Sequence, residues 1–312
     1  MRVFVAGATG VIGRSLLPLL VQDGHEVTGL TRKPERADLI RELGADPAIA
    51  DAFDRDGLRE VVVAARPEVV VHELTDIPRS IDPKKFAEQF ERNNRLRREG
   101  TRNLVDAARA AGARRVVAQS VAFMYARGDG GLHAEADPLA LDMPEPAGDT
   151  VRALADLEQA VTGADGMEGL VLRYGYFYGP GTSYASDGAQ AKMVRARRFP
   201  VVGDGGGVFS FIHVDDAAAA TVRALDRGNT GIYNVVDDDP APVRDWLPVF
   251  ADALEARTPR RVPALVARVA AGKYAVQMMT RSEGASNEKA RRELGIELRY
   301  ASWRRGFGQA LG

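Results

Sequence analysis

The sequence predicts a doubly wound α/β fold, built on a parallel sheet and followed by a smaller, mainly helical C-terminal part. A glycine-rich turn at 7–13 lies between a short apolar run and a stretch with helical spacing of leucines. Apolar runs then alternate with helical stretches along most of the chain. Continuous valines, as at 69–71, are typical of strands that are buried on both faces of a parallel sheet.

The first strand is expected at Arg2–Ala6, and the helix after the glycine turn carries its apolar residues three and four positions apart. We expect Pro18 to remove one hydrogen bond from this helix and to kink it. The remaining strands are expected at 26–31, 47–50, 69–74, 115–120, 169–173 and 232–236, with helical stretches between them.

Two segments rich in glycine, proline and polar residues, 129–149 and 179–188, interrupt this alternation. A basic helix at 191–199 follows the second segment. Long loops of this kind commonly carry ligand contacts, so we expect the substrate to meet these two segments.

Composition excludes several classes of function. The 42 basic and 43 acidic residues leave a formal net charge of −1, which predicts neither a nucleic-acid partner nor a membrane partner. Because the chain has no cysteine and its four histidines are widely spaced, disulfides are excluded and a metal site is not expected. No apolar stretch reaches 18 residues and the first residues do not read as an export signal, so we expect a cytoplasmic protein.

The glycine turn predicts a dinucleotide site. Its glycines are spaced GxxGxxG: Gly7 permits the tight turn, Gly10 lets the backbone approach a pyrophosphate, and Gly13 lets the helix pack close to the sheet. Unpaired amides at the start of the following helix favour the anion. The candidate cofactor contacts in the turn are Gly7, Thr9, Gly10, Val11, Ile12 and Gly13. This is the pattern of a Rossmann fold.

The second strand predicts NADP rather than NAD. An NAD site usually ends this strand with an acidic residue that binds the ribose, whereas this chain continues Thr31, Arg32 and Lys33. Two cations suit a 2′-phosphate. A solvated pair of loop charges is the alternative interpretation. Further candidate cofactor contacts follow the third and fourth strands, namely Asp51, Ala52, Leu74 and Thr75.

Several ordered motifs resemble the extended and atypical branches of the short-chain dehydrogenase/reductase superfamily, the relatives of nucleotide-sugar epimerases and dehydratases. The motifs are GATGVIG, EGTRNLVDAARAAG, VVAQSVAFMY, LRYGYFYGPG, FIHVDDAAAA and YNVVDD. The resemblance implies that the fourth motif passes over the nicotinamide, which makes Tyr174 a candidate cofactor contact. It also implies that 1–175, with 208–236 returning to it, form the dinucleotide-binding domain, and that 176–312 mainly bind substrate.

One departure from the family is as informative as the match. Family members carry a Tyr-x-x-x-Lys pair, in which the tyrosine transfers a proton and the lysine lowers the pKa of the tyrosine. Aligned on Glu158, this chain has Thr150 at the tyrosine position and Leu154 at the lysine position. None of the eight tyrosines has a lysine four residues later. The usual proton donor is therefore missing.

Other residues are candidates for the lost role. Ser120 matches the family serine that contacts the substrate carbonyl, although a strand-end serine bonded to the backbone is the alternative. Tyr176 is the candidate proton donor, with an aromatic ring packed under a loop as its alternative, and Tyr125 is a weaker candidate. A cluster of arginines could meet an anionic substrate, or form a solvated helix face as the alternative: Arg195, Arg197 and Arg198. We expect His213 and Asp215 to have a structural role.

We therefore expect an NADP-dependent oxidoreductase that reduces the carbonyl of a small organic substrate, a ketoreductase. The first alternative is a nucleotide-sugar epimerase or dehydratase, and the second is a non-catalytic, NADP-binding sensor or interaction protein. Because pairs of long helices in this family often form dimers, a homodimer is also an expectation.

Overall fold

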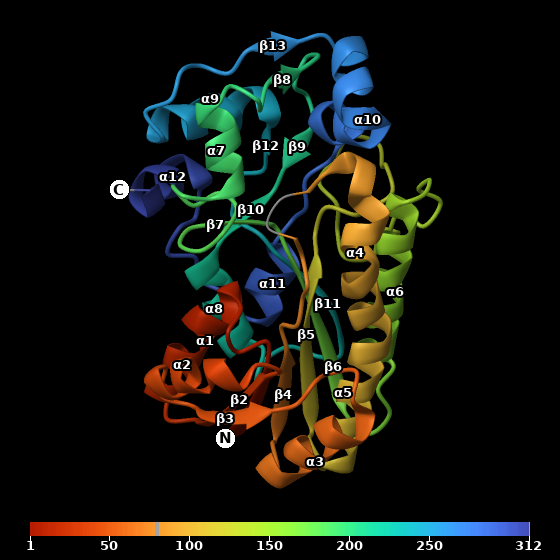
Figure 1. The fold of residues 1–312 in the computed structure, drawn as a ribbon, viewed down its shortest axis with the longest axis vertical. Helices are drawn as coiled ribbons and strands as arrows, with labels where there is room; N and C mark the ends of the chain where they lie inside the picture. The colour runs from red at the N-terminus through yellow and green to blue at the C-terminus, as the bar shows by residue number, and fades with distance from the viewer. Residues whose placement is uncertain (79–80, 312) are drawn as a thin grey trace.

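In the computed structural model, residues 1–78 and 81–311 are described, and they form a seven-stranded parallel sheet (Figure 1). The strand order is β11-β6-β5-β4-β1-β2-β3, and every neighbouring pair is parallel. The strands are β1 (Arg2–Ala6), β2 (Glu26–Thr31), β3 (Asp46–Ile49), β4 (Val69–His72), β5 (Arg115–Val121), β6 (Glu168–Tyr174) and β11 (Gly231–Val235). The carboxyl ends of parallel strands share one edge, which is where ligands bind in this class of fold.

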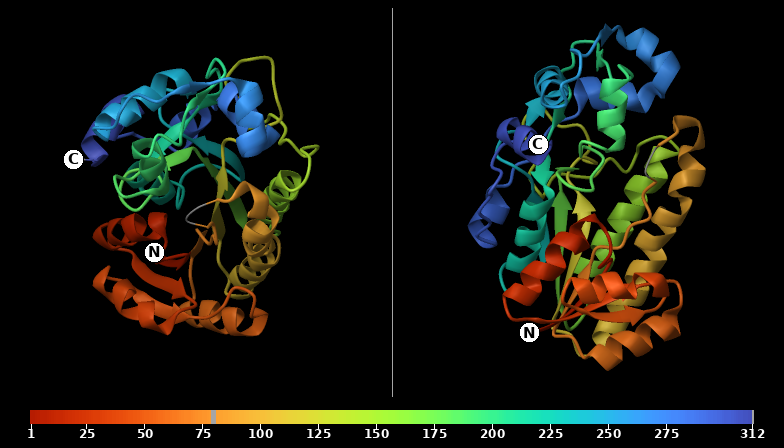
Figure 2. Two further views of the ribbon diagram at one scale, coloured as in Figure 1. Left: turned by 45° about the horizontal axis from the view of Figure 1, so that its top comes forward. Right: turned by 60° about the vertical axis from the view of Figure 1, so that its left-hand side comes forward.

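Helices cover both faces of the sheet (Figure 2). One face carries α1 (Val11–Gln22), α2 (Ala37–Glu42), α8 (Val214–Arg223) and α11 (Glu288–Glu293). The short 3₁₀ turn η1 (Pro34–Arg36) leads into α2. The other face carries α3 (Arg55–Ala65), α5 (Thr101–Ala110) and α6 (Ala147–Thr162). A turn η2 (Pro83–Lys85) leads into α4 (Phe86–Arg95), which the π-helical segment η3 (Leu96–Gly100) joins to α5.

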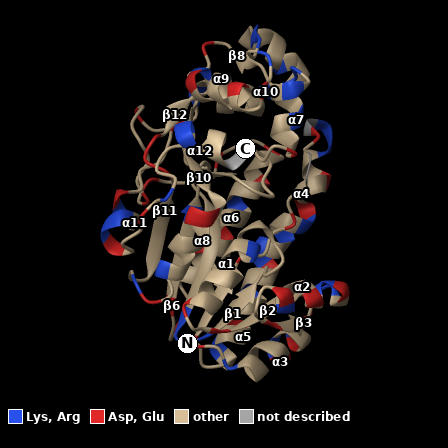
Figure 3. Ribbon diagram, turned by 90° about the vertical axis from the view of Figure 1, so that its left-hand side faces the viewer, with Lys and Arg blue, Asp and Glu red and all other residues tan. Residues whose placement is uncertain are grey.

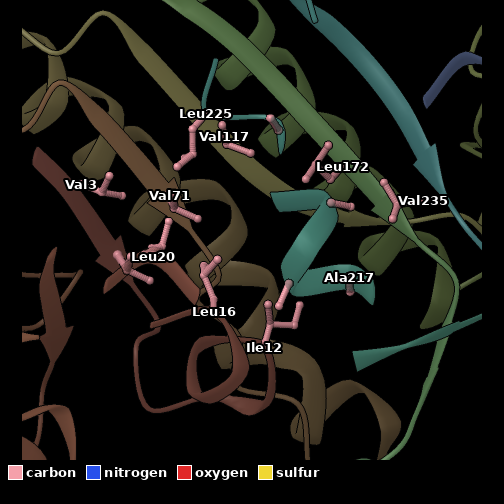
Figure 4. Close-up of a cluster of buried hydrophobic side chains, with 14 of the residues drawn as sticks. Val3, Ile12, Leu16, Leu20, Val71, Val117, Leu172, Ala217, Leu225 and Val235 are labelled. Carbon is pink, nitrogen blue, oxygen red and sulfur yellow. The ribbon is translucent and has the colours of Figure 1, made fainter. Parts of the chain in front are cut away.

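Alternating side chains of each strand fill the two halves of the core. Val3 and Val71 point towards α1 and α8, where Leu16 and Leu20 meet them (Figure 4). Phe4 and its neighbours on β4 and β5 point the other way, towards α3, α5 and α6. Burial on both faces explains the continuous apolar runs of these strands in the sequence.

The C-terminal part has its own aromatic core, formed around Trp246, Phe250, Trp303 and Phe307. In the described part of the chain, this region contains three short two-stranded ladders: β7 (Tyr176–Tyr178) with β10 (Phe211–His213), β9 (Val208–Phe209) with β12 (Ala241–Pro242), and β8 (Val201–Val202) with β13 (Arg261–Val262). Its helices are α7 (Ala189–Arg195), α9 (Val243–Ala253), α10 (Ala264–Arg281) and α12 (Trp303–Leu311).

Two local expectations need correction. β4 ends at His72 and not at 74, because the His72 ring turns back to accept a hydrogen bond from the Leu74 amide, 3.2 Å away. α1 continues through Pro18, whose side chain is exposed, whereas α10 is broken at Gly272, where φ is +86°. Pro18 therefore costs one hydrogen bond without ending its helix.

The surface mixes the two signs of charge. In the view of Figure 3, basic and acidic residues are mixed over the molecule, and neither sign covers a whole side. None of the described helices combines the length and the apolar composition that crossing a bilayer requires.

Candidate functional site

The glycine turn has the close backbone approach that a dinucleotide site requires. Gly7 has φ of +99°, and a Cβ atom there would lie 2.5 Å from the carbonyl oxygen of Glu73. A Cβ atom on Gly13 would lie 2.5 Å from the carbonyl oxygens of Gly7 and Ala8. Both glycines are therefore required by the fold itself.

Gly10 differs from Gly7 and Gly13, because its surroundings within the protein leave more room for a side chain. Apart from its chain neighbours and its own helix, a Cβ atom there would meet only the Gly7 carbonyl oxygen among the described residues, at 3.1 Å. Gly10 is also the N-cap of α1, and no side chain caps the helix there. The free amides of α1 and the open side of Gly10 fit the pyrophosphate of a dinucleotide.

Four arginine and lysine side chains surround the end of β2. Arg32 and Lys33 are exposed, which fits both a phosphate contact and a solvated pair of loop charges. The Arg36 guanidinium donates to the hydroxyl of Thr9 in the glycine turn, at 3.3 Å. Arg92 of α4 joins the cluster through its ion pairs with Asp51 and Asp76. The sequence reasoning missed Arg36 and Arg92, although Arg36 stands only three residues after Lys33.

Two acidic residues lie among these basic side chains. Asp76, in the loop after β4, lies 3.8 Å from Arg32 and 2.8 Å from Arg92. Asp51 lies 3.6 Å from Arg92, and its other oxygen accepts a 3.0 Å hydrogen bond from the Phe53 amide. Ala52, Leu74 and Thr75 follow strands at the same edge of the sheet: Ala52 after β3, Leu74 and Thr75 after β4. Their contact with a cofactor stays a prediction.

Ser120 is already engaged within the protein. Its hydroxyl donates a 2.7 Å hydrogen bond to Glu158 of α6. Arg173 of β6 donates to both oxygens of the same carboxylate, at 2.8 and 2.6 Å, and all three side chains are buried. Ser120 is thus neither bonded to the backbone nor directed at an open site, and it would have to leave Glu158 to reach a substrate carbonyl.

The positions of the missing catalytic pair are filled by buried residues of α6. The Thr150 hydroxyl accepts a hydrogen bond from Nδ2 of Asn94, at 3.2 Å. Leu154 lies in an apolar cluster with Met124 of the loop after β5, and Tyr274 of α10 packs against that cluster. Neither position offers an acidic proton near neutral pH.

An aromatic stack stands where the first domain meets the C-terminal part. The ring of Tyr176 lies between Phe123, with centroids 4.2 Å apart, and Phe209, at 4.4 Å. Tyr274 contributes its hydroxyl to the same region, 3.6 Å from the sulfur of Met124. The sequence reasoning found Tyr176 but missed its neighbours, because three different elements bring them together. Both faces of the Tyr176 ring are therefore covered by other aromatic rings.

The phenols of this region are weak acids. Burial raises the pKa of Tyr176 well above its ordinary value and raises the pKa of Tyr274 to about 12. Burial also raises the pKa of Tyr125, whose hydroxyl donates to Oδ1 of Asn234 at 2.6 Å. The Tyr176 hydroxyl makes no hydrogen bond to a described residue. None of the described lysines is among the groups that shift the pKa values of these phenols, whereas the family lysine lowers the pKa of its tyrosine.

Tyr174 points into the core. Its hydroxyl lies 2.7 Å from the Thr221 hydroxyl of α8 and donates to Glu73 at 3.3 Å. The side chain is fully buried, so only the backbone here is left for a cofactor. Burial raises the pKa of the Glu73 carboxyl to about 8, and its second oxygen has no hydrogen-bond partner among the described residues.

The remaining candidates stand beyond this site. The His213 ring accepts a hydrogen bond from the Asp215 amide at 3.1 Å and so caps α8, which is a structural role. The Arg195 guanidinium donates to the carbonyl of Ser186 in the loop before α7. Arg197 has φ of +57°, and its Nε is buried without a partner among the described residues.

Comparison with known proteins agrees with this geometry. A 3-diazoavenalumate denitrifying reductase from a Streptomyces species is 47% identical, over 99% of this chain and 100% of its own length. A 4-hydroxy-2-methyl-3-oxo-4-farnesyl-3,4-dihydroquinoline-1-oxide ketoreductase from Stigmatella aurantiaca is 29% identical, over 95% of this chain and 91% of its own. These names support an oxidoreductase activity.

Solved structures show the same fold at lower identity. The UDP-glucose 4-epimerase of Thermotoga maritima superposes with a TM-score of 0.77 at 19% identity, covering 99% of this chain and 97% of its own. A dTDP-glucose 4,6-dehydratase from Streptomyces venezuelae gives 0.77 at 21%, covering 99% and 95%. Residues 3–236 match the model of the NAD dependent epimerase/dehydratase family. The chain therefore belongs to the NAD dependent epimerase/dehydratase family.

Proposed function

We propose that the protein is an NADPH-dependent reductase that replaces the diazo group of an aromatic acid with hydrogen and releases dinitrogen. The observation that carries this proposal is the lack of a competent proton donor among the described residues of the site. Thr150 and Leu154 stand where the tyrosine and lysine of the family stand, and the pKa values of the nearby phenols are raised.

The chemistry of a diazonium carbon suits such a site. When bound, the reduced nicotinamide supplies a hydride, that is, a proton with two electrons. The hydride forms the new carbon–hydrogen bond, and the electron pair of the broken carbon–nitrogen bond leaves with dinitrogen. The aromatic carbon is reduced, the cofactor is oxidised, and no proton is consumed. Reduction of a ketone, by contrast, must place a proton on the alkoxide oxygen.

The aromatic stack supports an aromatic substrate. Phe123 and Phe209 cover the two faces of Tyr176, and together the three rings form an apolar aromatic surface next to which a flat substrate could pack. The relative from Streptomyces, 47% identical, is named for a diazo substrate and for denitrification. That identity extends over almost the whole of both chains, which supports carrying the reaction class over to this protein.

The preference for NADPH rests on the charges around β2. No carboxylate follows Thr31, and Arg32, Lys33 and Arg36 stand within one turn of each other beside the glycine turn. A 2′-phosphate would bring a charge that these cations are suited to bind. With NADH, Arg32 would keep Asp76 as its ion-pair partner but gain no phosphate contact.

An isotope experiment tests the proposal. The protein is mixed with 3-diazoavenalumate and NADPH that carries deuterium at both C4 positions, and released dinitrogen and the product mass are measured. We expect one equivalent of dinitrogen for each NADPH oxidised and one deuterium on the ring carbon that carried the diazo group. The Gly10→Val variant serves as the control without cofactor. A product without deuterium, or dinitrogen release no faster than in that control, would contradict the proposal.

Carbonyl reduction is the second candidate. It is supported by the relative from Stigmatella aurantiaca that is named a ketoreductase, and by the unbonded hydroxyl of Tyr176. In this case a proton comes from Tyr176, from water or from a hydroxyl of the substrate itself. A panel of ketones, followed by NADPH absorbance, separates this activity from the first.

A further inference from the structure

Arg97 is a buried arginine on η3, the π-helical segment between α4 and α5. Only 6% of its surface is exposed, and it forms no hydrogen bond or ion pair with any described residue. Its Nη1 atom is fully buried without a partner in the described part of the chain. Burial lowers the pKa of Arg97 to about 10, so the guanidinium remains charged at neutral pH. A buried charge of this kind is costly to fold around.

The other deeply buried arginines show how this chain usually treats such a group. Arg115 and Arg173 are each 3% exposed. Arg115 binds Glu168 and also donates to three backbone carbonyls, while Arg173 makes two parallel bonds to Glu158. Arg97 departs from this pattern. Its missing counter-charge is therefore a property of this site and not of buried arginines in this protein.

The residues one turn before Arg97 also carry unused polar atoms. Nδ2 of Asn93 and Oδ1 of Asn94 are buried and have no partner among the described residues. Asn93 accepts a 2.9 Å hydrogen bond from the amide of Asp76, in the loop after β4, and Asn94 donates to Thr150. Three unsatisfied polar side chains thus share one helix surface, next to the carboxyl end of β4.

Contacts on both sides of Arg97 fix its position along the helix. One turn further on, the hydroxyl of Thr101 lies 2.8 Å from Nε2 of His72, the last residue of β4. The next residue, Arg98, binds Asp149 and Asp156 of α6, which bracket the position where the family lysine is missing. The helical stretch that carries Arg97 is therefore held between β4 and the part of α6 that contains the position of the absent lysine. A π-helical segment is frequently found at a functional site.

We propose that Arg97 binds an oxyanion of a ligand that enters this site and supplies there the positive charge that the family lysine would supply. The oxyanion has two chemical sources. One is the carboxylate of an aromatic acid, which rests on the proposed function, and the other is the pyrophosphate of the dinucleotide. Arg97 presents a planar group with several donors, and Nδ2 of Asn93 adds another donor beside it.

Two titrations test the proposal and separate the sources. NADP⁺ is titrated into the free protein, and cinnamate is titrated into the protein saturated with NADP⁺, both by calorimetry. Arg97→Met removes the charge while keeping a long side chain, and Arg97→Lys restores the charge. The matched control is Arg102→Met, which removes an exposed arginine from α5. The thermal midpoint of each variant is measured without ligand.

We expect Arg97→Met to weaken one of the two ligands at least tenfold and to leave the thermal midpoint unchanged or higher, because an unpaired buried charge has been removed. Arg97→Lys should recover most of the affinity, and Arg102→Met should resemble the wild type. Loss of cinnamate binding alone assigns Arg97 to a substrate carboxylate, and loss of NADP⁺ binding assigns it to the pyrophosphate.

Two results would overturn the proposal. The first is that Arg97→Met binds both ligands as tightly as the wild type does, or that the wild type binds neither ligand. The second is that Arg97→Met fails to fold, or that it melts several degrees lower while its affinity for both ligands is unchanged. Arg97 would then support the fold and not a ligand. Both titrations are independent of turnover, so a failure of the diazo reaction leaves their outcome readable.

Discussion

The hydroxyl of Ser120 donates a 2.7 Å hydrogen bond to Oε1 of Glu158, and the same oxygen accepts a 2.8 Å bond from Nε of Arg173. A strand-end serine and a helix carboxylate are in this way joined to the neighbouring strand through one buried ion pair. The family position that would contact a substrate carbonyl has become part of the internal support of β5, β6 and α6.

The first prediction concerns this network. Glu158→Gln leaves Arg173 charged and buried without a counter-charge, so we expect a loss of about 3–5 kcal/mol in the free energy of unfolding. Ser120→Ala removes one bond to a carboxylate, and we expect it to cost about 1–3 kcal/mol. Urea unfolding of both variants measures these losses. Equal losses for the two variants would contradict the assigned order of importance.

The second prediction is a dependence of stability on pH that Glu73 causes. Burial raises the pKa of this carboxyl from 4.5 to about 8 in the folded protein. Between those values the folded state holds a proton that the unfolded chain has lost. The stabilising contribution of Glu73 is thus complete below pH 4.5 and falls as the pH rises to 8, by at most about 1.4 kcal/mol for each pH unit.

Glu73→Gln keeps the shape of the neutral acid and cannot ionise. We expect this variant to lose that part of the slope and to be more stable than the wild type at pH 8 to 9, as measured by thermal melts across the pH range. Glu42→Gln is the matched control, because Glu42 is exposed on α2. An identical slope in the wild type and Glu73→Gln would mean that Glu73 is already ionised within the fold.

Sequence periodicity was sufficient for the sheet, since strands buried on both faces leave continuous apolar runs. The glycine turn was equally readable, because its glycine spacing lies between an apolar strand and a helix of the same βαβ unit, although the contact that Gly7 makes with the Glu73 carbonyl comes from a distant segment. Ser120 illustrates the limit: its partner Glu158 is 38 residues away, on a helix whose packing no local pattern encodes. The stack around Tyr176 has the same origin, with Phe123 and Phe209 arriving from distant segments.

The sequence also could not predict which charged side chains would be buried without a hydrogen-bond or ion-pair partner. Arg97 stands among the charged residues Arg95, Arg98 and Glu99, and its letter alone resembles another exposed helix residue. Arg97 lies on the π-helical segment η3, whose register departs from the α-helical period, so a 3.6-residue pattern does not predict its burial. Only the fold distinguishes Arg97, which lacks a partner among the described residues, from Arg98, which binds two aspartates.

The third prediction concerns cofactor choice. Arg32→Ala should weaken NADPH about tenfold or more and leave NADH nearly unchanged, because only NADPH offers a 2′-phosphate for a charge-assisted hydrogen bond. Arg36→Ala should weaken NADPH as well, with a smaller effect on NADH through the lost bond to Thr9. Fluorescence titration with both cofactors is the measurement, and Arg41→Ala on α2 is the control. Equal weakening of both cofactors by Arg32→Ala would assign Arg32 to the fold.

The fourth prediction uses the open side of Gly10. Gly10→Val should abolish the binding of either cofactor without unfolding the protein, because the new side chain fills the space of the pyrophosphate. Gly13→Val is the contrasting variant: its side chain meets backbone carbonyls at 2.5 Å, so it should destabilise the fold itself. Calorimetry and circular dichroism on the same samples distinguish the two effects. Cofactor binding retained by a folded Gly10→Val would show that the turn serves no dinucleotide.

The last prediction separates the two proposed reactions at Tyr176. If a ketone is reduced and Tyr176 donates the proton, Tyr176→Phe should lower kcat by roughly 10² to 10⁴. If a diazo group is displaced by hydride, no proton is needed, and the same variant should keep most of its activity because Phe preserves the stacking on Phe123 and Phe209. Thr150→Val is the control for both, since its hydroxyl accepts a bond from Asn94 and has no acidic role. A diazo reaction abolished by Tyr176→Phe would restore the phenol as the catalytic acid, and its raised pKa would then have to fall when substrate and cofactor bind.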